Sequence, residues 1–410
     1  MLELYTPTLV WALPTLVGTD ALALLFTYLT RWRHDTLAAK YVAWQTEAQD
    51  VEKATHAAIY NQPQNEKPVY PRVSIVVAAQ NQARQLEYLL PKLLEQQYKG
   101  KFEVVVVDQV STDDTEEVLK RLELSYSHLR HSFVPPHSRH IELRKLALTI
   151  GIKAARSEWV IVVNPDTVPV DSQWLQHYAE NLLPGVDWVQ AYLNYDDDGS
   201  DTARRAILDR VRLQNLRLQA YENGVILGCD TANYAIRKTW FLQNQGFADS
   251  LQIPFGEESL LAYFHTDAER TTFLCSPDTR LTEEVPGSAQ MKYNRIQMAE
   301  LARRMKGAGR TYFARAFATS WFIYLYILLT TIYIGLRVWI DIDAGVYQMC
   351  YLYTDVVMLL LFLLAGFLPQ WGLRKSMKAL GERKIKGYVY IYDLLQPWRT
   401  LAAHIARRKN

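Results

Sequence analysis

Residues 73–119 constrain the fold more than any other stretch of the chain. Two short runs of β-branched apolar residues, at 73–77 and 104–107, are typical of strands buried on both faces of a parallel sheet. Between them, leucines recur at helical spacing, at Leu86, Leu89, Leu90, Leu93 and Leu94. The pattern predicts a strand–helix–strand unit, and such units place ligand sites just past the carboxyl ends of their strands.

An aspartate stands at one such strand end. Asp108 follows the second apolar run and precedes Ser111, Thr112 and Asp113, which have the side chains of a helix N-cap. Two interpretations are open at this point. Asp108 either binds a ligand or is an ordinary turn residue, because strand–helix–strand units in general end in polar turns.

The pattern continues along the chain. Strands are predicted at 128–134, 159–163 and 186–195, and helices at 142–155, from about 174, and at 202–221. Several strands end in acids, which indicates a doubly wound, Rossmann-like α/β sheet with a crevice that fits a nucleotide. The sequence has no glycine-rich phosphate loop. A bound diphosphate would therefore be neutralised by a metal ion or by arginine and lysine side chains.

Composition excludes some partners and compartments. Lysine plus arginine number 45 and aspartate plus glutamate 43, so nothing predicts binding to nucleic acid. The three cysteines, Cys229, Cys275 and Cys350, have neither metal-site spacing nor an even number, which indicates a reducing compartment.

Three apolar segments, at 9–28, 317–336 and 346–368, have about the length that a helix needs to cross a bilayer. Basic residues flank them on one side only, the cytoplasmic side by the positive-inside rule. They predict a multi-pass protein of the bacterial inner (cytoplasmic) membrane, with one amino-terminal and two carboxyl-terminal transmembrane helices and the catalytic domain in the cytoplasm. The alternative is three helices buried in a protein core.

This interpretation divides the chain into five parts. They are an amino-terminal anchor (1–34), a helical linker (35–67), a soluble domain (68–309), two transmembrane helices (310–371) and a cytoplasmic amphipathic tail (372–410). Within the tail, a helix at 394–407 is expected to lie on lipid headgroups. It could equally be a surface helix packed on the soluble domain.

The motifs of the soluble domain resemble those of the family 2 glycosyltransferases, inverting enzymes with the GT-A fold, over roughly residues 73–304. The resemblance implies that the doubly wound sheet is mixed, with parallel and antiparallel strands. VAAQNQ at 77–82, VDQVSTD at 107–113 and RKLALT at 144–149 stand where that family has "iPayNe", "vDDgStD" and "gKa.ALn". The resemblance implies a nucleotide-sugar donor, most often a UDP-sugar, with the nucleobase at Asp108. It also implies a donor site that includes Ala79, Asn81 and Lys145.

The family's metal motif, Asp-x-Asp, is only partly kept. Asn164, Pro165 and Asp166 occupy it, so one carboxylate remains. The resemblance implies that Asp166 holds Mg²⁺ or Mn²⁺ on the sugar diphosphate, since one carboxylate, diphosphate oxygens and water suffice for such an ion. The alternative is that Asp166 is a turn residue at a strand end.

FGEESLL at 255–261 resembles the family's "gEDxxL", whose aspartate is the catalytic base. Glu258 takes that position and keeps the carboxylate on a side chain longer by one methylene. Inverting transfer needs one base, which takes the proton of the acceptor hydroxyl. A structural role is also open, because acids suit the amino terminus of a helix.

Processive members of the family carry Gln-x-x-Arg-Trp, which residues 292–299 lack. A non-processive enzyme is therefore expected. Arg295, in the same region, is a candidate for binding the donor diphosphate or for contacting the membrane interface.

The leading hypothesis is a membrane-bound inverting glycosyltransferase of polysaccharide or glycolipid biosynthesis. It would transfer a sugar from a nucleotide sugar to a lipid-linked or glycolipid acceptor at the cytoplasmic face. The second hypothesis, motivated by the altered motifs, is a catalytically silent subunit that accompanies other subunits in a membrane complex. A third is a nucleotidyltransferase, which usually has a glycine-rich loop after the first strand.

Overall fold

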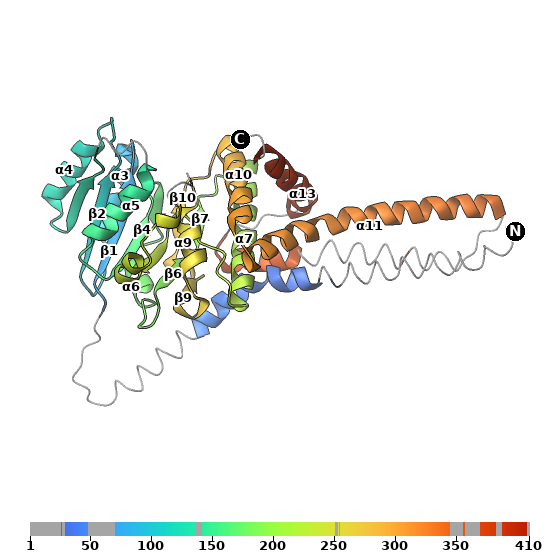
Figure 1. The fold of residues 1–410 in the computed structure, drawn as a ribbon, viewed down its shortest axis with the longest axis horizontal. Coiled ribbons are helices and arrows are strands. Elements are labelled where there is room, and N and C mark those ends of the chain that lie inside the picture. The colour runs from blue at the N-terminus through green and yellow to red at the C-terminus, as the bar shows by residue number, and fades with distance from the viewer. Residues whose placement is uncertain are drawn as a thin grey trace, which may run out of the picture.

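A computed structural model describes residues 26, 29–47, 70–135, 142–250, 253, 255–344, 356, 370–382 and 388–407. A layered sheet domain occupies one end of the molecule in Figure 1, and one long helix, α11, extends away from it. Helices α7, α10 and α13 lie between the two.

In the described part of the chain, the main sheet has seven strands in the order β3-β2-β1-β4-β8-β6-β9. β1 (Val73–Ala79) is central and pairs in parallel with β2 (Phe102–Asp108) and β4 (Trp159–Val163). β3 (Leu129–Phe133) extends this parallel half at the edge. Ala79 pairs with Asp108, and Val77 with Val163, so β1, β2 and β4 end along one edge of the sheet.

The other half of the sheet contains antiparallel pairs. β8 (Tyr234–Arg237) is antiparallel to both β4 and β6 (Trp188–Ala191), and β9 (Thr271–Leu274) pairs in parallel with β6. The prediction of a mixed α/β sheet is therefore confirmed.

Each face of the sheet has its own hydrophobic core, which explains the continuous apolar runs of the strands. On one face, Ile75 and Val77 of β1 pack with α3 (Ala83–Leu94), α4 (Thr115–Ser125) and α6 (Trp174–Ala179). On the other face, Val76 and Ala78 of β1 pack with helices α5 and α7.

Helix α5 (Leu143–Ala154) approaches the sheet closely. A Cβ atom on Gly151 would lie 2.5 Å from Cγ1 of Val76, so only glycine fits there without a shift. Helix α7 (Asp201–Glu222) begins at Ser200, whose hydroxyl accepts a hydrogen bond from the Ala203 amide at 3.0 Å.

A strand predicted at 186–195 is in fact two strands in two sheets. β6 ends at Ala191, and β7 (Leu193–Tyr195) joins a small three-stranded sheet with β10 (Leu281–Glu283) and β5 (Thr167–Pro169). The chain changes partners at the buried Tyr192, whose amide donates to the carbonyl of Leu274. β5 directly follows Asp166, so the small sheet fixes one side of that residue.

Three further helices lie beyond the two sheets. α10 (Ser288–Arg304) leads through a short turn into α11 (Ala308–Ala344), and α13 (Tyr388–Arg407) packs against both. Trp321 of α11 and Trp398 of α13 have ring centroids 5.0 Å apart. The tail helix predicted at 394–407 is thus the carboxyl-terminal part of a longer helix.

Within the described residues, no helix combines the length and the apolar character needed to cross a bilayer. The predicted spans at 9–28 and 346–368 lie outside the described residues, apart from Phe26 and Val356. The span predicted at 317–336 falls inside α11 and remains a prediction. Of the predicted linker at 35–67, residues 35–47 are helical and the rest lies outside the described residues.

Candidate functional site

The ends of β1 and β2 are tied together by side-chain hydrogen bonds. Asn81, in the left-handed region at φ 52°, accepts a hydrogen bond from the Thr112 amide at 2.7 Å. The Asn81 amide in turn donates to the hydroxyl of Ser111 at 2.9 Å. The Asp108 carboxylate accepts from both the amide and the hydroxyl of Ser111. These bonds give the edge a defined shape and leave Asp108 half-buried at it.

Ala79 is buried at the end of β1, and its carbonyl accepts from the amide of Gln109 at 2.8 Å. Ala79 therefore shapes this edge through its backbone and not through its side chain. The predicted donor residues Ala79, Asn81 and Asp108 do lie together at one edge of the sheet. Whether they bind a donor stays a prediction.

The end of β4 carries the altered metal motif. Asn164 accepts from Arg144 through its side-chain oxygen and donates to the hydroxyl of Thr231 through its nitrogen, both at 3.1 Å. Asp166 is exposed. The protein around it nevertheless raises the pKa of its carboxyl by desolvation, against the opposing charge of Arg144.

Arg144, in the first turn of α5, links this strand end to a pair of buried glutamates. Its guanidinium lies 3.1 Å from Glu257 and 2.7 Å from Glu258, and it also donates to the carbonyl of Thr231 at 2.8 Å. The two glutamates are 3% and 1% exposed and open helix α9 (Glu257–His265). A guanidinium that donates a hydrogen bond to each of two buried carboxylates offsets much of the cost of burying them.

Burial, and to a smaller extent the neighbouring Glu257, raise the pKa of Glu258 to about 7 against the opposing effect of Arg144. The same two carboxylates raise the pKa of Arg144. At neutral pH, Glu258 therefore exchanges readily between its protonated and ionised forms. A carboxyl group with a pKa near the working pH is suited to general base catalysis.

Two of the predicted donor-binding residues have other partners. Lys145 is 1% exposed, and its ammonium donates to the carbonyls of Ser250, at 2.6 Å, and Ile253. Burial lowers its pKa. Arg295 forms an ion pair with Asp209 at 2.7 Å. Their predicted roles in donor binding therefore have no support in this geometry.

Sequence reasoning missed Arg144 and Glu257. Arg144 directly precedes the lysine that matched the family pattern, and Glu257 directly precedes the matched glutamate. The signal in the sequence was a pair of adjacent residues of like charge, Arg144 with Lys145 and Glu257 with Glu258. Which of these side chains face the site depends on how α5 and α9 are turned.

The donor atoms at the end of β4 fit a divalent cation only in part. Among the described residues, no group of three or more His, Cys, Asp and Glu could hold a metal ion. Asp166 offers one carboxylate, while the side-chain oxygen of Asn164 already accepts from Arg144. These residues fit a cation that takes its other ligands from substrate oxygens and water.

Asp108 and Asp166 lie where the parallel strands of the mixed sheet end, at one edge of that sheet. Residues 74–243 match the family model described as glycosyl transferase family 2. The matched region contains Asp108, Arg144 and Asp166, and Glu258 lies beyond it. Residues 74–243 are thus similar to glycosyl transferase family 2, and this similarity supports a glycosyltransferase.

Among solved structures, the mannosyltransferase PcManGT from Pyrobaculum calidifontis, in complex with GDP-Man and Mn²⁺, shares 17% identity with a TM-score of 0.51. The alignment covers 95% of this chain and 98% of that one. TarS of S. aureus (residues 1–349, in complex with UDP-GlcNAc) shares 15% identity with a TM-score of 0.40, covering 82% of this chain and 92% of that one. A comparison with curated proteins finds no match. The likeness to PcManGT supports the fold.

Proposed function

We propose that this protein is a membrane-anchored, inverting, non-processive glycosyltransferase. It transfers a sugar from a nucleotide sugar to a lipid-linked or glycolipid acceptor at the cytoplasmic face of the bacterial inner membrane. The observation that carries the proposal is the buried Glu258, with a pKa of about 7, joined through Arg144 to the strand end that holds Asn164. Base and donor edge are thereby held in one hydrogen-bonded unit.

In this proposal the donor lies along the edge formed by the ends of β1, β2 and β4. Asp108 accepts hydrogen bonds from the nucleobase, and the Asn81–Thr112 contact holds the adjacent loop. The sequence resemblance favours a UDP-sugar, whereas PcManGT was solved with GDP-Man. Both donors therefore belong in the first test.

Glu258 takes the proton of the acceptor hydroxyl as its oxygen attacks the anomeric carbon. The bond to the nucleoside diphosphate breaks on the opposite face of the sugar, so the anomeric configuration inverts. Arg144 aims the carboxylate and keeps part of the Glu258 population ionised. Glu257 shares Arg144 and keeps the pKa of Glu258 from falling to that of a free carboxyl.

Asp166 would hold a divalent cation, and PcManGT was solved with Mn²⁺. Such an ion supplies positive charge to the donor diphosphate. Arg144 and Arg210 act to lower the pKa of Asp166, against the larger effect of desolvation, which raises it.

Exposed apolar side chains on two helices support the attachment to a membrane. α11 exposes Leu325, Leu328 and Ile332, and α13 exposes Ile391, Leu395, Trp398 and Ile405. Exposed apolar surface of this extent is typical of a protein or membrane contact. α11 extends away from the sheet domain and α13 packs against α11, and this placement fits a lipid surface (Figure 1).

The first test uses the full chain in neutral detergent. Thermal unfolding is followed with UDP-, GDP-, CMP- and dTDP-sugars, each with Mn²⁺ and with EDTA, and transfer to lipid extracts is then assayed with the stabilising donor. We expect one nucleotide to raise the melting temperature in a metal-dependent way and the product to have the inverted anomeric configuration. Absence of stabilisation by every donor would refute the proposal and favour the silent subunit.

A further inference from the structure

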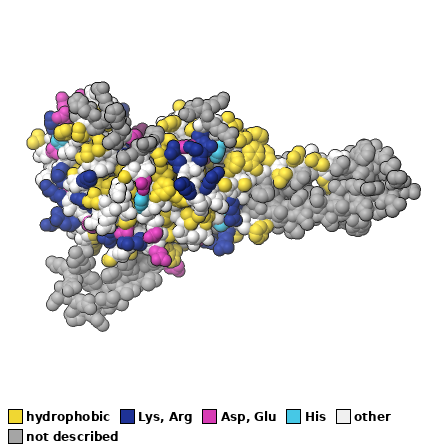
Figure 2. All heavy atoms as spheres, in the orientation of Figure 1, with side chains coloured by type: hydrophobic (Ala, Val, Ile, Leu, Met, Phe, Trp, Pro, Cys, Tyr) yellow, Lys and Arg dark blue, Asp and Glu magenta, His cyan; other side chains and the backbone are white. Residues whose placement is uncertain are grey.

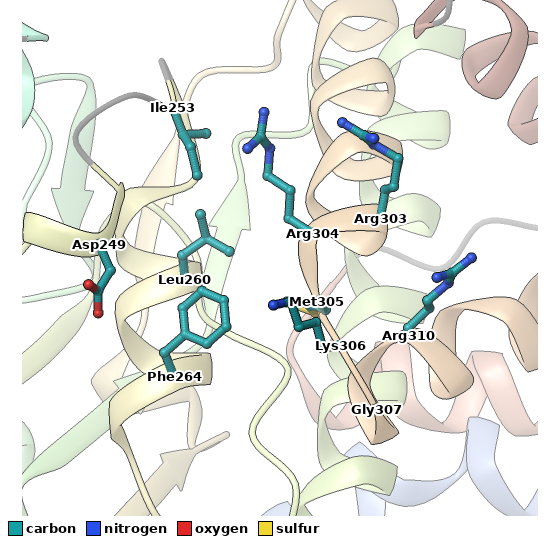
Figure 3. Close-up of a pocket in the computed structure, with 10 residues that line it drawn as sticks. All are labelled: Asp249, Ile253, Leu260, Phe264, Arg303, Arg304, Met305, Lys306, Gly307 and Arg310. Atoms are coloured by element: carbon teal, nitrogen blue, oxygen red, sulfur yellow. The ribbon is translucent and has the colours of Figure 1, made fainter.

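A pocket of about 540 Å³ lies where α9, the end of α10 and the start of α11 meet (Figure 3). It is distinct from the candidate active site. Leu260 lines it from α9, and Glu258 precedes Leu260 by two residues, which is about 200° around a helix. The pocket and the proposed base therefore lie on opposite faces of α9.

The two sides of the pocket differ in chemistry. One side is apolar and is formed by Ile253, Leu260 and Phe264, with Met305 at the base. The other side is basic and contains Arg303, Arg304, Lys306 and Arg310. Figure 3 shows the arginines of α10 and α11 across the hollow from Leu260 and Phe264. In the space-filling view, basic side chains gather over α10 beside hydrophobic ones (Figure 2).

The basic side carries more positive charge than its neighbours neutralise. Arg303 and Arg304 share a single carboxylate, Glu300, at 2.7 and 2.9 Å. Within the described structure, Lys306 and Arg310 have no carboxylate within ion-pair distance. The one acid that lines the pocket, Asp249, is paired with His265 at 2.8 Å.

The backbone adds to this charge. Gly307, at φ 60°, makes the turn into α11, and a Cβ added there would meet open space. The first amides of α11 follow directly at the pocket. Amides in the first turn of a helix have no acceptor within the helix and favour an anion. The side chains and the backbone therefore favour the same kind of ligand.

We propose that this pocket binds the phosphate headgroup of a membrane lipid. The cations and the first turn of α11 hold the phosphate, and the apolar side accepts the adjoining glycerol or hydrocarbon portion. Free phosphate would use only the basic half. The proposal rests on the membrane attachment proposed above, because α11 runs from this pocket toward its exposed Leu325, Leu328 and Ile332.

The test titrates the full chain in neutral detergent with dioctanoyl phosphatidylglycerol, dioctanoyl phosphatidylcholine or inorganic phosphate, with thermal unfolding as the readout. Lys306→Gln/Arg310→Gln removes two cations that lack carboxylate partners. Lys120→Gln/Arg204→Gln is the matched control, since both residues form only exposed ion pairs within their own helices. We expect phosphatidylglycerol to bind at least tenfold more weakly to the pocket variant and within twofold of the wild type to the control.

Equal affinity of the wild type and the pocket variant for phosphatidylglycerol would overturn the proposal. Inorganic phosphate that stabilises at the same concentration as phosphatidylglycerol would overturn the assignment to a lipid. If the double variant does not fold, the exposed Arg310→Gln alone gives the same comparison. Donor-induced stabilisation, measured on the same samples, separates the two proposals: the pocket variant should retain it, and its absence from all samples would refute only the glycosyltransferase proposal.

Discussion

The two charged regions beside α9 differ in burial and in how their charges are paired. At its amino end, Glu257 and Glu258 are buried, and Arg144 compensates them at 3.1 and 2.7 Å. In the pocket beyond, Lys306 and Arg310 are exposed and have no carboxylate partner within the described residues. Buried charges must be paired, because an unpaired one is costly, whereas exposed excess charge costs little. The first arrangement therefore shifts the pKa of Glu258, whereas the exposed cations of the second are available to a ligand.

Loss of the proposed base should have the largest effect on activity. Glu258→Gln keeps the shape of the side chain but cannot accept the proton. We expect turnover to fall about 10²–10⁴-fold, the range for a general base, with donor affinity unchanged. Single-turnover transfer and donor titration measure the two quantities. Turnover at the wild-type rate would remove Glu258 from the mechanism.

Removal of the compensating charge should chiefly affect stability. Arg144→Gln leaves two buried carboxylates without a cation, and breaking a buried pair in this way costs about 3–5 kcal/mol. The pKa of Glu258 should also rise, because Arg144 now lowers it. Urea unfolding gives the first quantity and the pH–rate profile the second. Arg144→Lys should recover part of the stability, and a variant as stable as the wild type would show that Arg144 does not compensate the pair.

The pH dependence follows from the pKa of Glu258 of about 7. Activity should rise through this pH as the carboxyl loses its proton. For stability the sign is opposite: the folded-state pKa lies above the ordinary 4.5, so protonation favours the folded state. The contribution of Glu258 to the free energy of unfolding is therefore present below pH 4.5 and is lost as the pH rises to about 7. Glu258→Gln should lack this step, and an identical pH–stability curve would contradict the assignment.

The smallest effect is expected at the altered metal motif. Asn164→Asp restores a second carboxylate beside Asp166, which should tighten Mn²⁺ binding by on the order of tenfold. The new carboxylate also competes with Glu258 for Arg144, because the Asn164 side chain already contacts that guanidinium at 3.1 Å. Mn²⁺ titration of donor binding measures the first effect. No change in Mn²⁺ affinity would place the cation away from Asn164.

The parallel half of the sheet was predictable because its signals are local. The apolar runs of β1, β2 and β4 each report burial on both faces within a few residues. The division of the predicted 186–195 strand at Tyr192 was not predictable, because it arises from pairing with β9 and β10, some 80–90 residues further on. Periodicity within a strand carries no information about which sheet it joins.

Prediction of the site from local sequence patterns has the same limit. Glu258 was found because it stands inside a short motif, FGEESLL. Arg144 was not found because its role depends on acids 113 and 114 residues away. Lys145 was assigned to the donor through a motif match, whereas folding turns its ammonium toward Ser250 and Ile253. A local pattern can identify a functional side chain, but the role of that side chain depends on partners that are distant in the sequence.

Arg144 and Lys145 are consecutive residues at the start of α5, yet they hold different parts of the chain. Arg144 binds the first turn of α9, and Lys145 binds the carbonyls of the segment that leads into it. One turn of α5 therefore holds α9 directly through Arg144 and holds the segment before α9 through Lys145. A change that breaks the contacts of Arg144 would therefore leave the segment before α9 attached to α5 through Lys145.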